Sequence, residues 1–464
     1  MGVGERDTRA NAATITVAAS DSPYRTRADY VCDGTADEVE INLALQSAGK
    51  VKLMEGTFTV SSPVDMPNDS QLSGMGKKTV LTPANDADDS VIQNADQSGG
   101  NSNITIGDLF IDGNSSNNDV EFACGIHLQQ VDGFQIYRCF TNDTYGYGIR
   151  LGAVENGNVS FCRLENSGYS GGLVVATGDT ITLSNLLIRD NVDGAGYGIY
   201  ADTTTDLHIL GCRVSNSKDE ALALQVSSIR TQVIGGKFGD STTGGGCHAG
   251  YGTVDLLVMG AAFSNNALMG FTLERDVAET IHSGTSKIIG CDFNDNLQDG
   301  LHIYTDDVII QGCGIQGNGL RGMRTYYKTP TRLQIINNLF RNNGLVTNNA
   351  HLEMDNTTNS RISGNTFIDD QSTPTTTYAV KEAATCSGNI IEGNCISGMK
   401  TAPLSLQSTS TARFNVGDGA NPLAVIPHGA DADYARPHGY GPVLWIGSVT
   451  PNNAATNDIY IPTV

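Results

Sequence analysis

The sequence has few charged and few aromatic residues. Of its 464 residues, 17% are charged, 6% are aromatic and only one is a tryptophan. Basic residues are outnumbered by acidic ones, 28 to 50, so the formal net charge is −22. A nucleic-acid-binding protein needs a basic face to displace counterions from phosphates, and we therefore expect no nucleic-acid partner. The low charge and the 39% of hydrophobic residues also argue against a disordered chain.

Long apolar runs are missing as well. No stretch is long enough to span a membrane, and the opening MGVGERDTRANAATITVAAS has no apolar core of a secretion signal. We therefore expect no membrane insertion, no Sec signal, and synthesis in a cytoplasm. Half of the ten cysteines recur at one position of a repeat, where a thiol behaves as a small core residue, so we expect them to be reduced.

Glycine is abundant instead, with 54 residues, and much of it belongs to an internal repeat. The stretch IGCDFNDNLQDGLHIY (289–304) returns 22 residues later as QGCGIQGNGLRGMRTY (311–326). One ladder position can be followed along the chain at intervals of 22 to 30 residues. Its members are Leu109, Cys139, Cys162, Leu186, Cys212, Gly236, Ala261, Cys291, Cys313, Asn338, Asn365 and Asn394. Self-similarity with this period indicates a solenoid.

The residue types within each repeat select the kind of solenoid. Short runs of alternating apolar residues are separated by Asn, Asp and Gly turns, and no repeat contains an amphipathic helix. This pattern predicts an all-β, right-handed parallel β-helix with three short strands per coil and about a dozen coils. Neighbouring coils then stack about 4.8 Å apart, with the ladder position in the core. No residue pattern indicates a metal or a cofactor.

The ends of a solenoid need covering, because they expose core residues and strand edges. Residues 1–50 are predicted to supply an N-terminal strand and a capping helix, at whose start Thr35 and Glu38 have the spacing of a capping box. Residues 51–416 form the parallel β-helix. Residues 417–464 follow as a linker and a small C-terminal β segment that caps or oligomerises the chain.

The opening of the predicted solenoid resembles a known superfamily. The segment DGTADEVEINLALQSAGKVKLMEGTFTV (33–60) is similar to the head of pectate-lyase-like right-handed parallel β-helices, and turns such as ISGNTF (362–367) resemble their repeat. The resemblance covers residues 13–414 and is greatest to tailspike and tail-fibre β-helix proteins of phages. It implies a glycan partner, a homotrimer, and a place in the virion tail if a phage encodes the chain. The catalytic motifs of polygalacturonases and alginate epimerases are missing, so no named activity is implied.

Alternate residues of a strand point to opposite faces. We therefore predict that the residue eleven positions after each ladder residue points outward, and that these residues form one row along the solenoid. A second outward row lies two residues further along each coil. The predicted outward residues are Arg150, Ala223, Thr272, His302 and Arg324 in the first row, Glu274, Tyr304 and Tyr326 in the second, and, by a looser alignment, Tyr200, Asp202, His351 and Glu353. These positions are free to carry function because the core does not constrain them.

One segment near these rows stands out by its charge. RGMRTYYKTPTRLQIINNLFR (321–341) has five basic residues and no acidic one within an acidic chain. Aromatic rings offer flat faces on which sugars stack, and Arg or Lys pairs with carboxylates. The segment therefore predicts a basic site for an anionic glycan, with Tyr327 and Lys328 as further substrate-binding candidates.

Three interpretations of this face stay open: an ordinary solvated or subunit-packing surface, a non-catalytic glycan- or receptor-binding groove, and a catalytic site. For an anionic glycan, Arg324 or Lys328 would neutralise the carboxylate. His302 or Tyr304 would then act as the base and Tyr326 as the acid, which is lyase or epimerase chemistry.

For a neutral glycan, hydrolysis needs two carboxylates, and the candidate pairs are Asp202 with Glu274 or Glu274 with Glu353. Tyr200 and His351 complete the set of expected substrate-binding residues. The sequence thus predicts a tailspike-like protein that recognises a polysaccharide, with lyase or glycosidase activity as one interpretation. The alternatives are a structural or receptor-binding tail protein without chemistry and a free-standing polysaccharide lyase or glycoside hydrolase.

Overall fold

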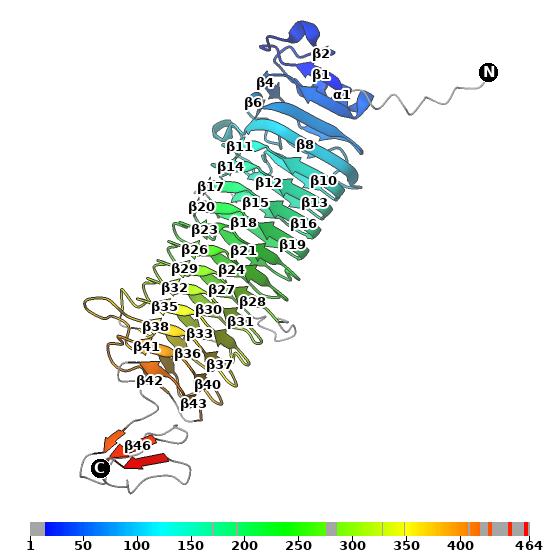
Figure 1. Ribbon diagram of the computed structural model, residues 1–464. Coiled ribbons are helices and arrows are strands. Elements are labelled where there is room, and N and C mark those ends of the chain that lie inside the picture. Colours follow the sequence, from blue (N-terminus) through cyan, green and yellow to red (C-terminus); the bar gives the residue numbers. More distant parts are fainter. Residues whose placement is uncertain are drawn as a thin grey trace, which may run out of the picture. The chain divides into compact units, whose positions relative to one another are not determined.

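The computed structural model confirms an all-β parallel solenoid, with about 14 turns where about a dozen were predicted. The chain divides into two compact units, Met1–His248 and Ala249–Val464, and successive turns stack within each (Figure 1). The described residues are 14–168, 171–191, 194–274, 285–326, 328–347, 349–406 and 409–417, and the strands β45 (Ile426–His428), β46 (Leu444–Gly447) and β47 (Ile459–Pro462). These last three strands form a separate parallel sheet. The boundaries predicted at residues 50 and 416 stay predictions.

The first unit begins with the helix α1 (Glu38–Ala48), which packs against the strands β1 (Ile15–Ala18) and β3 (Lys50–Leu53). Its buried apolar face is made of Ile41, Ala44, Leu45 and Ala48. Gly49 ends the helix in the left-handed conformation, at a φ of 67°, and its N–H donates to the carbonyl of Leu45. Glycine suits this place because it has no Cβ to clash.

The predicted capping box of α1 is wrong. The N-cap residue is Asp37, and the Thr35 hydroxyl donates to Asp33 instead. The Asp37 carboxylate accepts hydrogen bonds from the backbone N–H groups of Gly34 and Thr59, both at 2.8 Å. These bonds tie the start of the helix to the neighbouring strand β4 (Gly56–Val60), so packing against the first turn takes the place of a local cap.

In the rest of the first unit, one strand of each turn joins a parallel sheet. Arg150 on this sheet lies opposite His127 on one side and Val174 on the other, and Val174 lies opposite Tyr200. The strands are β5 (Val64–Met66), β7 (Ile92–Asn94), β9 (Ile126–Gln129), β12 (Tyr147–Gly152), β15 (Gly171–Val175), β18 (Tyr197–Asp202) and β21 (Leu222–Gln225). Their parallel register places one residue of every turn in the same row.

The second unit confirms three short strands per coil. One coil consists of β28 (Lys287–Ile289), β29 (Asp292–Asn294) and β30 (Leu301–Ile303). The next coil repeats it as β31 (Ile309–Gln311), β32 (Gly314–Gln316) and β33 (Met323–Thr325). Central residues such as Phe293 and Ile315 lie opposite each other in the core. The strands are therefore held by backbone pairing between turns and by stacked side chains inside.

The ladder position lies in the core, as predicted. Its cysteines are buried and none forms a disulfide, whereas Cys395, which is not a ladder residue, is exposed. The asparagines are bonded from turn to turn: Nδ2 of Asn338 donates to Oδ1 of Asn365 at 3.0 Å, and Nδ2 of Asn365 donates to Oδ1 of Asn394 at 3.0 Å. A buried amide is stable here because every turn supplies its partner.

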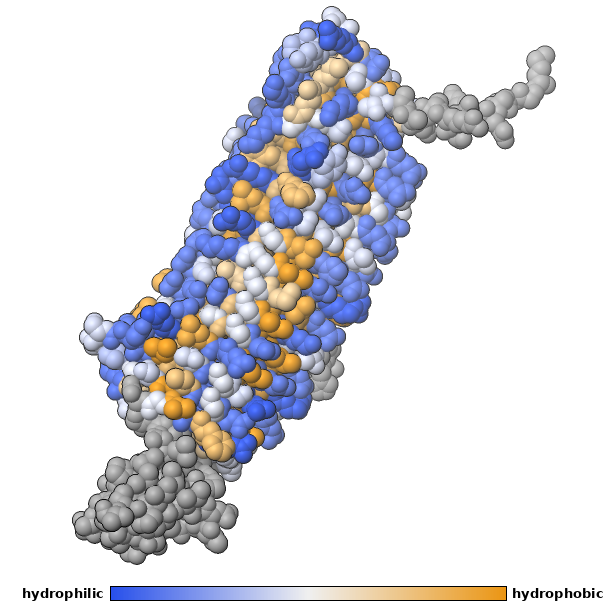
Figure 2. Space-filling view, in the orientation of Figure 1, coloured by the Kyte–Doolittle hydropathy of each residue, from blue (hydrophilic) through white to orange (hydrophobic). Residues whose placement is uncertain are grey.

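The outer surface is largely hydrophilic. On the face seen in Figure 2, apolar residues form small groups that are separated by hydrophilic ones. No helix among the described residues combines the length and the apolar character that crossing a membrane requires.

Candidate functional site

The candidate site lies on one sheet of the second unit, along β27 (Phe271–Leu273), β30, β33 and β36 (Leu352–Met354). The flanking residues of these strands, such as Leu301 and Ile303, are buried in the core. The central residues therefore point to the other face. In register they are Thr272, His302, Arg324, Glu353 and, on β39 (Val380–Glu382), Lys381. Thr272, His302 and Arg324 thus share one row, as predicted, although Thr272, His302 and Glu353 are largely covered, with exposures of 5%, 8% and 8%. Ala223, which was predicted to point outward as well, is fully buried.

Three side chains of one turn form a hydrogen-bonded relay on this sheet. Nε2 of His302 bonds to Oδ2 of Asp299, and the hydroxyl of Tyr304 lies 2.6 Å from Nδ1 of the same imidazole. Asp299 is buried, His302 is almost buried and Tyr304 is half-buried. We call Asp299, His302 and Tyr304 the relay. Its phenol is the member nearest to solvent.

The direction of the hydrogen bonds in the relay follows from the chemistry of its members. A carboxylate oxygen accepts hydrogen bonds, so Nε2 of His302 donates to Asp299, and in this tautomer Nδ1 presents its lone pair to the Tyr304 hydroxyl. Burial, followed by the charge of Glu274, raises the pKa of Tyr304 to about 12. Tyr304 therefore keeps its proton at neutral pH. It acts as a base only if its own proton passes to His302 at the same moment.

Arg324 lies on the next turn, in register with His302. Its Nη2 donates to Oδ2 of Asp355 at 3.2 Å, and its guanidinium lies 4.0 Å from the centre of the Tyr326 ring. The buried Nε has no hydrogen-bond partner among the described residues. The guanidinium thus contacts both an acid and an aromatic ring, and its Nε still lacks an acceptor within the described part of the chain.

Glu353 is surrounded by cations. Its carboxylate accepts from Nε of Arg321 at 2.6 Å and from Nζ of Lys381 at 3.3 Å, and Nη1 of Arg321 also lies 3.6 Å from Oδ1 of Asp299. Burial alone would raise the pKa of Glu353, but the hydrogen bonds and charges of Arg321 and Lys381 hold that pKa below its ordinary value. A carboxylate kept ionised in this way cannot serve as the general acid of a hydrolase.

The basic segment 321–341 is not a basic island in the structure, contrary to the sequence-based prediction. Besides Arg321 and Arg324, Arg332 forms two hydrogen bonds with Asp307, at 2.7 and 2.6 Å. Arg341 pairs in the same way with Asp370. The acidic partners come from neighbouring turns, so the charges balance in space although they are separated in sequence.

Several predicted site residues lie around the relay. Tyr326 is 42% exposed, and its ring centre lies 6.4 Å from that of Tyr304. Glu274 follows β27 and is half-buried; its backbone N–H donates to the carbonyl of Ala249 at 2.8 Å. Lys328 is half-buried and its backbone N–H donates to the carbonyl of Tyr326. Tyr327 lies outside the described residues.

The prediction for His351 is wrong, because its side chain lies in the core with no exposure. Its Nδ1 is 3.0 Å from Nδ2 of Asn343 and its Nε2 is 3.1 Å from the carbonyl of Ile368. The looser alignment of the repeat placed it on the outward face, but the strand starts only at Leu352. At the corner before it the chain bends and strand alternation no longer applies.

Tyr200 and Asp202 belong to the first unit, whereas the relay belongs to the second. Tyr200 is half-buried on β18, and its ring centre lies 5.1 Å from that of Tyr197. Asp202 lies opposite Gln225, and its Oδ1 accepts from the Thr203 hydroxyl at 2.8 Å. Both residues are on the predicted sheet.

The sequence-based reasoning missed Asp299, the buried end of the relay. The available signal was its place three residues before His302 in LQDGLHIY (297–304). Because the chain turns between these two residues, no strand alternation relates them. Asp355 was missed as well, since its link to Arg324 spans 31 residues.

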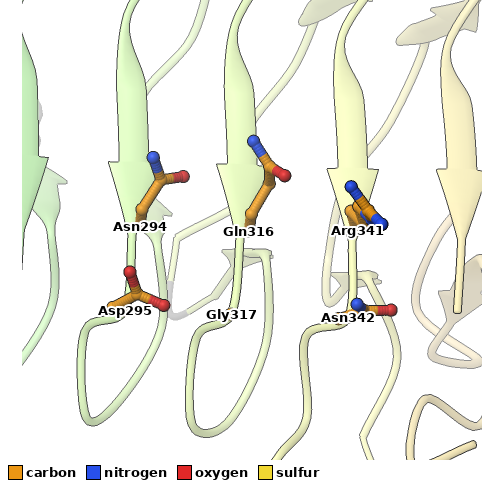
Figure 3. Close-up of a pocket in the computed structure, with 6 residues that line it drawn as sticks. All are labelled: Asn294, Asp295, Gln316, Gly317, Arg341 and Asn342. Atoms are coloured by element: carbon orange, nitrogen blue, oxygen red, sulfur yellow. The ribbon is translucent and has the colours of Figure 1, made fainter. Parts of the chain in front are cut away.

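A hollow of this unit lies on a different sheet from the relay, formed by β29, β32 and β35 (Leu339–Arg341). Figure 3 shows side chains from three neighbouring strands lined up in it. They are Asn294, Gln316 and Arg341, with Asp295, Gly317 and Asn342 in the turns that follow. Its amides can form hydrogen bonds, but Arg341 is occupied by Asp370. The hollow contains no relay of acid and base.

Comparison with known proteins adds a family and a fold. The sequence matches the family described as "Right handed beta helix region" over residues 97–268 and 279–419. No curated protein matches it.

Several solved structures are similar in fold. Tailspike protein 3 of bacteriophage CBA120 is 12% identical with a TM-score of 0.52, over 82% of this chain and 58% of that one. The pre-mature gene product 12 of bacteriophage phi29 is 12% identical with a TM-score of 0.52, over 89% and 60%. The A-module of the mannuronan C-5 epimerase AlgE6 from Azotobacter vinelandii is 18% identical with a TM-score of 0.46, over 83% and 96%. At these identities the likeness concerns the fold.

Proposed function

This chain belongs to the right-handed β-helix family, and we propose that it binds an acidic polysaccharide across β27, β30, β33 and β36 and cleaves it by β-elimination. The observation that carries the proposal is the relay, in which a buried carboxylate orients an imidazole that accepts from a phenol. A phenol held in this way is suited to proton transfer. Arg324 on the adjacent turn supplies a cation for the carboxylate of a uronate unit.

The elimination removes the proton on the carbon next to the uronate carboxyl group. This proton passes to the oxygen of Tyr304 while the phenolic proton moves to Nδ1 of His302, and Asp299 stabilises the imidazolium that forms. The electron pair of the broken C–H bond becomes the new carbon–carbon double bond, and the neighbouring C–O bond breaks. The exposed Tyr326 gives a proton to the leaving oxygen. The imidazolium of His302 then releases its extra proton to solvent and Tyr326 regains one from solvent, so both groups return to their starting states.

Elimination fits the site better than hydrolysis does. A glycosidase needs two carboxyl groups that are free to act, one of them protonated. Here Glu353 is paired with Arg321 and Lys381, and Asp355 is paired with Arg324. In contrast, the phenol, the imidazole and the guanidinium of the elimination route lie on two adjacent turns.

A second candidate function is that of a non-catalytic receptor-binding tail protein. The ion pairs that balance Arg321, Arg324, Arg332 and Arg341 favour it, because a site without an excess of positive charge attracts a polyanion weakly. The similarity in fold to a bacteriophage tailspike supports a place in a virion tail for either function. A homotrimer along the solenoid belongs to the same proposal.

The test is a panel of acidic and neutral polysaccharides incubated with the full chain. New reducing ends and the ultraviolet absorbance of an unsaturated uronate are followed together. We expect both signals from the wild type, and a loss of about 100- to 10,000-fold in rate for Tyr304→Phe, since a general acid–base group contributes about that much. Arg324→Ala should raise KM and lower kcat, because it loses both the carboxylate contact and its stabilisation in the transition state.

Matched controls come from the same unit. Tyr251→Phe removes a hydroxyl from an exposed tyrosine, and Arg332→Ala breaks an exposed ion pair; both should keep full activity. Reducing ends without the absorbance would refute elimination in favour of hydrolysis. Binding without any cleavage would favour the receptor-binding function, and neither binding nor cleavage would refute both.

A further inference from the structure

The first unit has a separate hollow, far from the relay in sequence and on another sheet. It is lined by Gln135, Tyr137, Arg138, Asn158, Ser160 and Phe161. The first three come from β10 (Val131–Tyr137) and the residue after it, the others from β13 (Val154–Ser160) and the residue after it. In the parallel register Gln135 lies opposite Asn158 and Tyr137 lies opposite Ser160. We call these six residues the aromatic hollow.

Phe161 is the least expected member of the aromatic hollow. Its side chain is 63% exposed and its backbone has a φ of 55°, in the left-handed region. This conformation is an outlier for a bulky residue, and the ring buries too little surface to compensate. The next two strands of this sheet are each followed by an equivalent residue. These residues are Asn185 and Gly211, which tolerate a positive φ. Neither folding nor backbone preference accounts for a phenyl ring here.

Tyr137 provides a second, fixed ring. It lies over the backbone of Gly107 on the preceding turn, so closely that a Cβ at Gly107 would be 2.3 Å from the Tyr137 ring. The guanidinium of Arg138 lies 4.9 Å from the centre of the same ring and is held by two hydrogen bonds to Asp108, at 2.6 and 2.8 Å. The aromatic wall is therefore in place before any ligand arrives.

The floor of the hollow is polar. Oδ1 of Asn158 is buried and has no hydrogen-bond partner among the described residues. A buried acceptor without a donor is unfavourable, so this oxygen is a place where a ligand gains an interaction that the protein alone lacks. Gln135 next to it is exposed and offers both a donor and an acceptor.

We propose that the aromatic hollow is a saccharide-binding subsite. The rings of Phe161 and Tyr137 take the apolar face of a sugar ring, and Oδ1 of Asn158 accepts a hydrogen bond from one of its hydroxyl groups. A sugar fits because it combines an apolar face with hydroxyls at its edge, as the hollow combines rings with amides. The proposal does not require the relay to be catalytic, because the two places share no residue.

A protein partner fits the hollow less well. A second copy of this chain would need a large contiguous contact surface. On the turns before and after that of Phe161, however, the equivalent positions hold the charged Arg138 and the polar Asn185. One exposed ring between polar neighbours matches a small ligand.

The test is Phe161→Gly, which removes the ring and also the backbone strain. Phe414→Gly is the matched control, because Phe414 is 64% exposed at a φ of 56° but lies in the second unit. The probe is an array of neutral and acidic oligosaccharides applied to the full chain. We expect Phe161→Gly to lose about tenfold in affinity for the oligosaccharides that the wild type binds, while Phe414→Gly binds like the wild type. Both variants should melt at or above the wild-type temperature, since glycine tolerates this backbone.

Several outcomes would overturn the subsite. It is refuted if the wild type binds no oligosaccharide, or if Phe161→Gly binds as well as the wild type does. A change in the sedimentation coefficient of Phe161→Gly would instead identify Phe161 as a subunit contact. The loss must persist in an Arg324→Ala background, which separates this subsite from the site of the proposed function. Asn158→Ala should weaken the same oligosaccharides without changing the melting temperature by more than a few degrees.

Discussion

The hydroxyl of Tyr304 lies 2.6 Å from Nδ1 of His302, and the opposite side of that imidazole bonds to Asp299. The phenol and the buried carboxylate are thereby connected through one imidazole ring. The connection also fixes the tautomer of His302, on which the proposed proton transfer depends.

Asp299→Asn tests this connection. The amide can turn its NH₂ group toward Nε2 of His302, so the imidazole would carry its proton on Nδ1 and could no longer accept from Tyr304. We expect a loss of about 100- to 10,000-fold in the rate of polysaccharide cleavage, and a change of tautomer in the ¹⁵N spectrum of the imidazole. Asp307→Asn, which breaks an exposed ion pair with Arg332, is the control. An unchanged tautomer in Asp299→Asn would contradict the assigned hydrogen bonds.

The asparagines inside the second unit should be costly to remove. Nδ2 of Asn318 donates to the carbonyl of Phe293 at 2.9 Å and to Oδ1 of Asn343 at 2.8 Å, and its Oδ1 accepts from the backbone N–H of Asn296 at 3.1 Å. Asn318→Ala leaves several of these buried groups without partners, so we expect the free energy of unfolding to fall by about 3 kcal/mol.

The measurement is urea denaturation of the full chain. Asn216→Gly serves as the control, because among the described residues the amide of Asn216 bonds to Asp190 at the surface, and its φ of 53° suits glycine. Its effect should stay below about 1 kcal/mol. Equal effects of the two substitutions would show that the inner ladder does not stabilise the solenoid.

His351 should make stability depend on pH. Burial lowers its pKa to about 3, while a histidine of the unfolded chain titrates near 6.5. Between these values the unfolded state binds a proton that the folded state does not, so stability falls as the pH falls below about 6.5. From pH 6.5 to 5 this amounts to about 1.5 kcal/mol. Urea denaturation of the wild type and of His351→Gln at both pH values measures the contribution of His351 to this change in the free energy of unfolding. An identical pH dependence in the two proteins would disprove that contribution.

The cysteines should react very unequally with a thiol reagent. Nine of the ten are buried and only Cys395 is exposed. Burial also raises the pKa of Cys124, Cys212 and Cys386 to about 11, so the reactive thiolate is scarce. We expect one fast-reacting thiol in the native protein and ten after denaturation, with Cys395→Ser abolishing the fast phase. Several fast thiols in that variant would contradict the buried ladder.

Much of the site could be placed from the sequence. The alternation within each strand makes His302 and Arg324 point away from the core, because the residues on either side of them face it. The period of the repeat and the parallel pairing of the strands then place the two side chains in one row. The same rule failed for His351, which lies at a corner, and it could not find Asp299, which lies in a turn.

What the sequence by itself determined is the solenoid: its alternating strands, its turns and its ladder of small residues are local patterns that repeat. What only the tertiary structure decided is which charges meet. Arg321 pairs with Glu353, 32 residues away, and Arg324 pairs with Asp355, 31 residues away. Turns of unequal length set these distances, so side chains that are remote in sequence come together only when the coils stack. The five basic residues of 321–341 therefore looked like a positive patch in the sequence, whereas four of them form ion pairs in the fold.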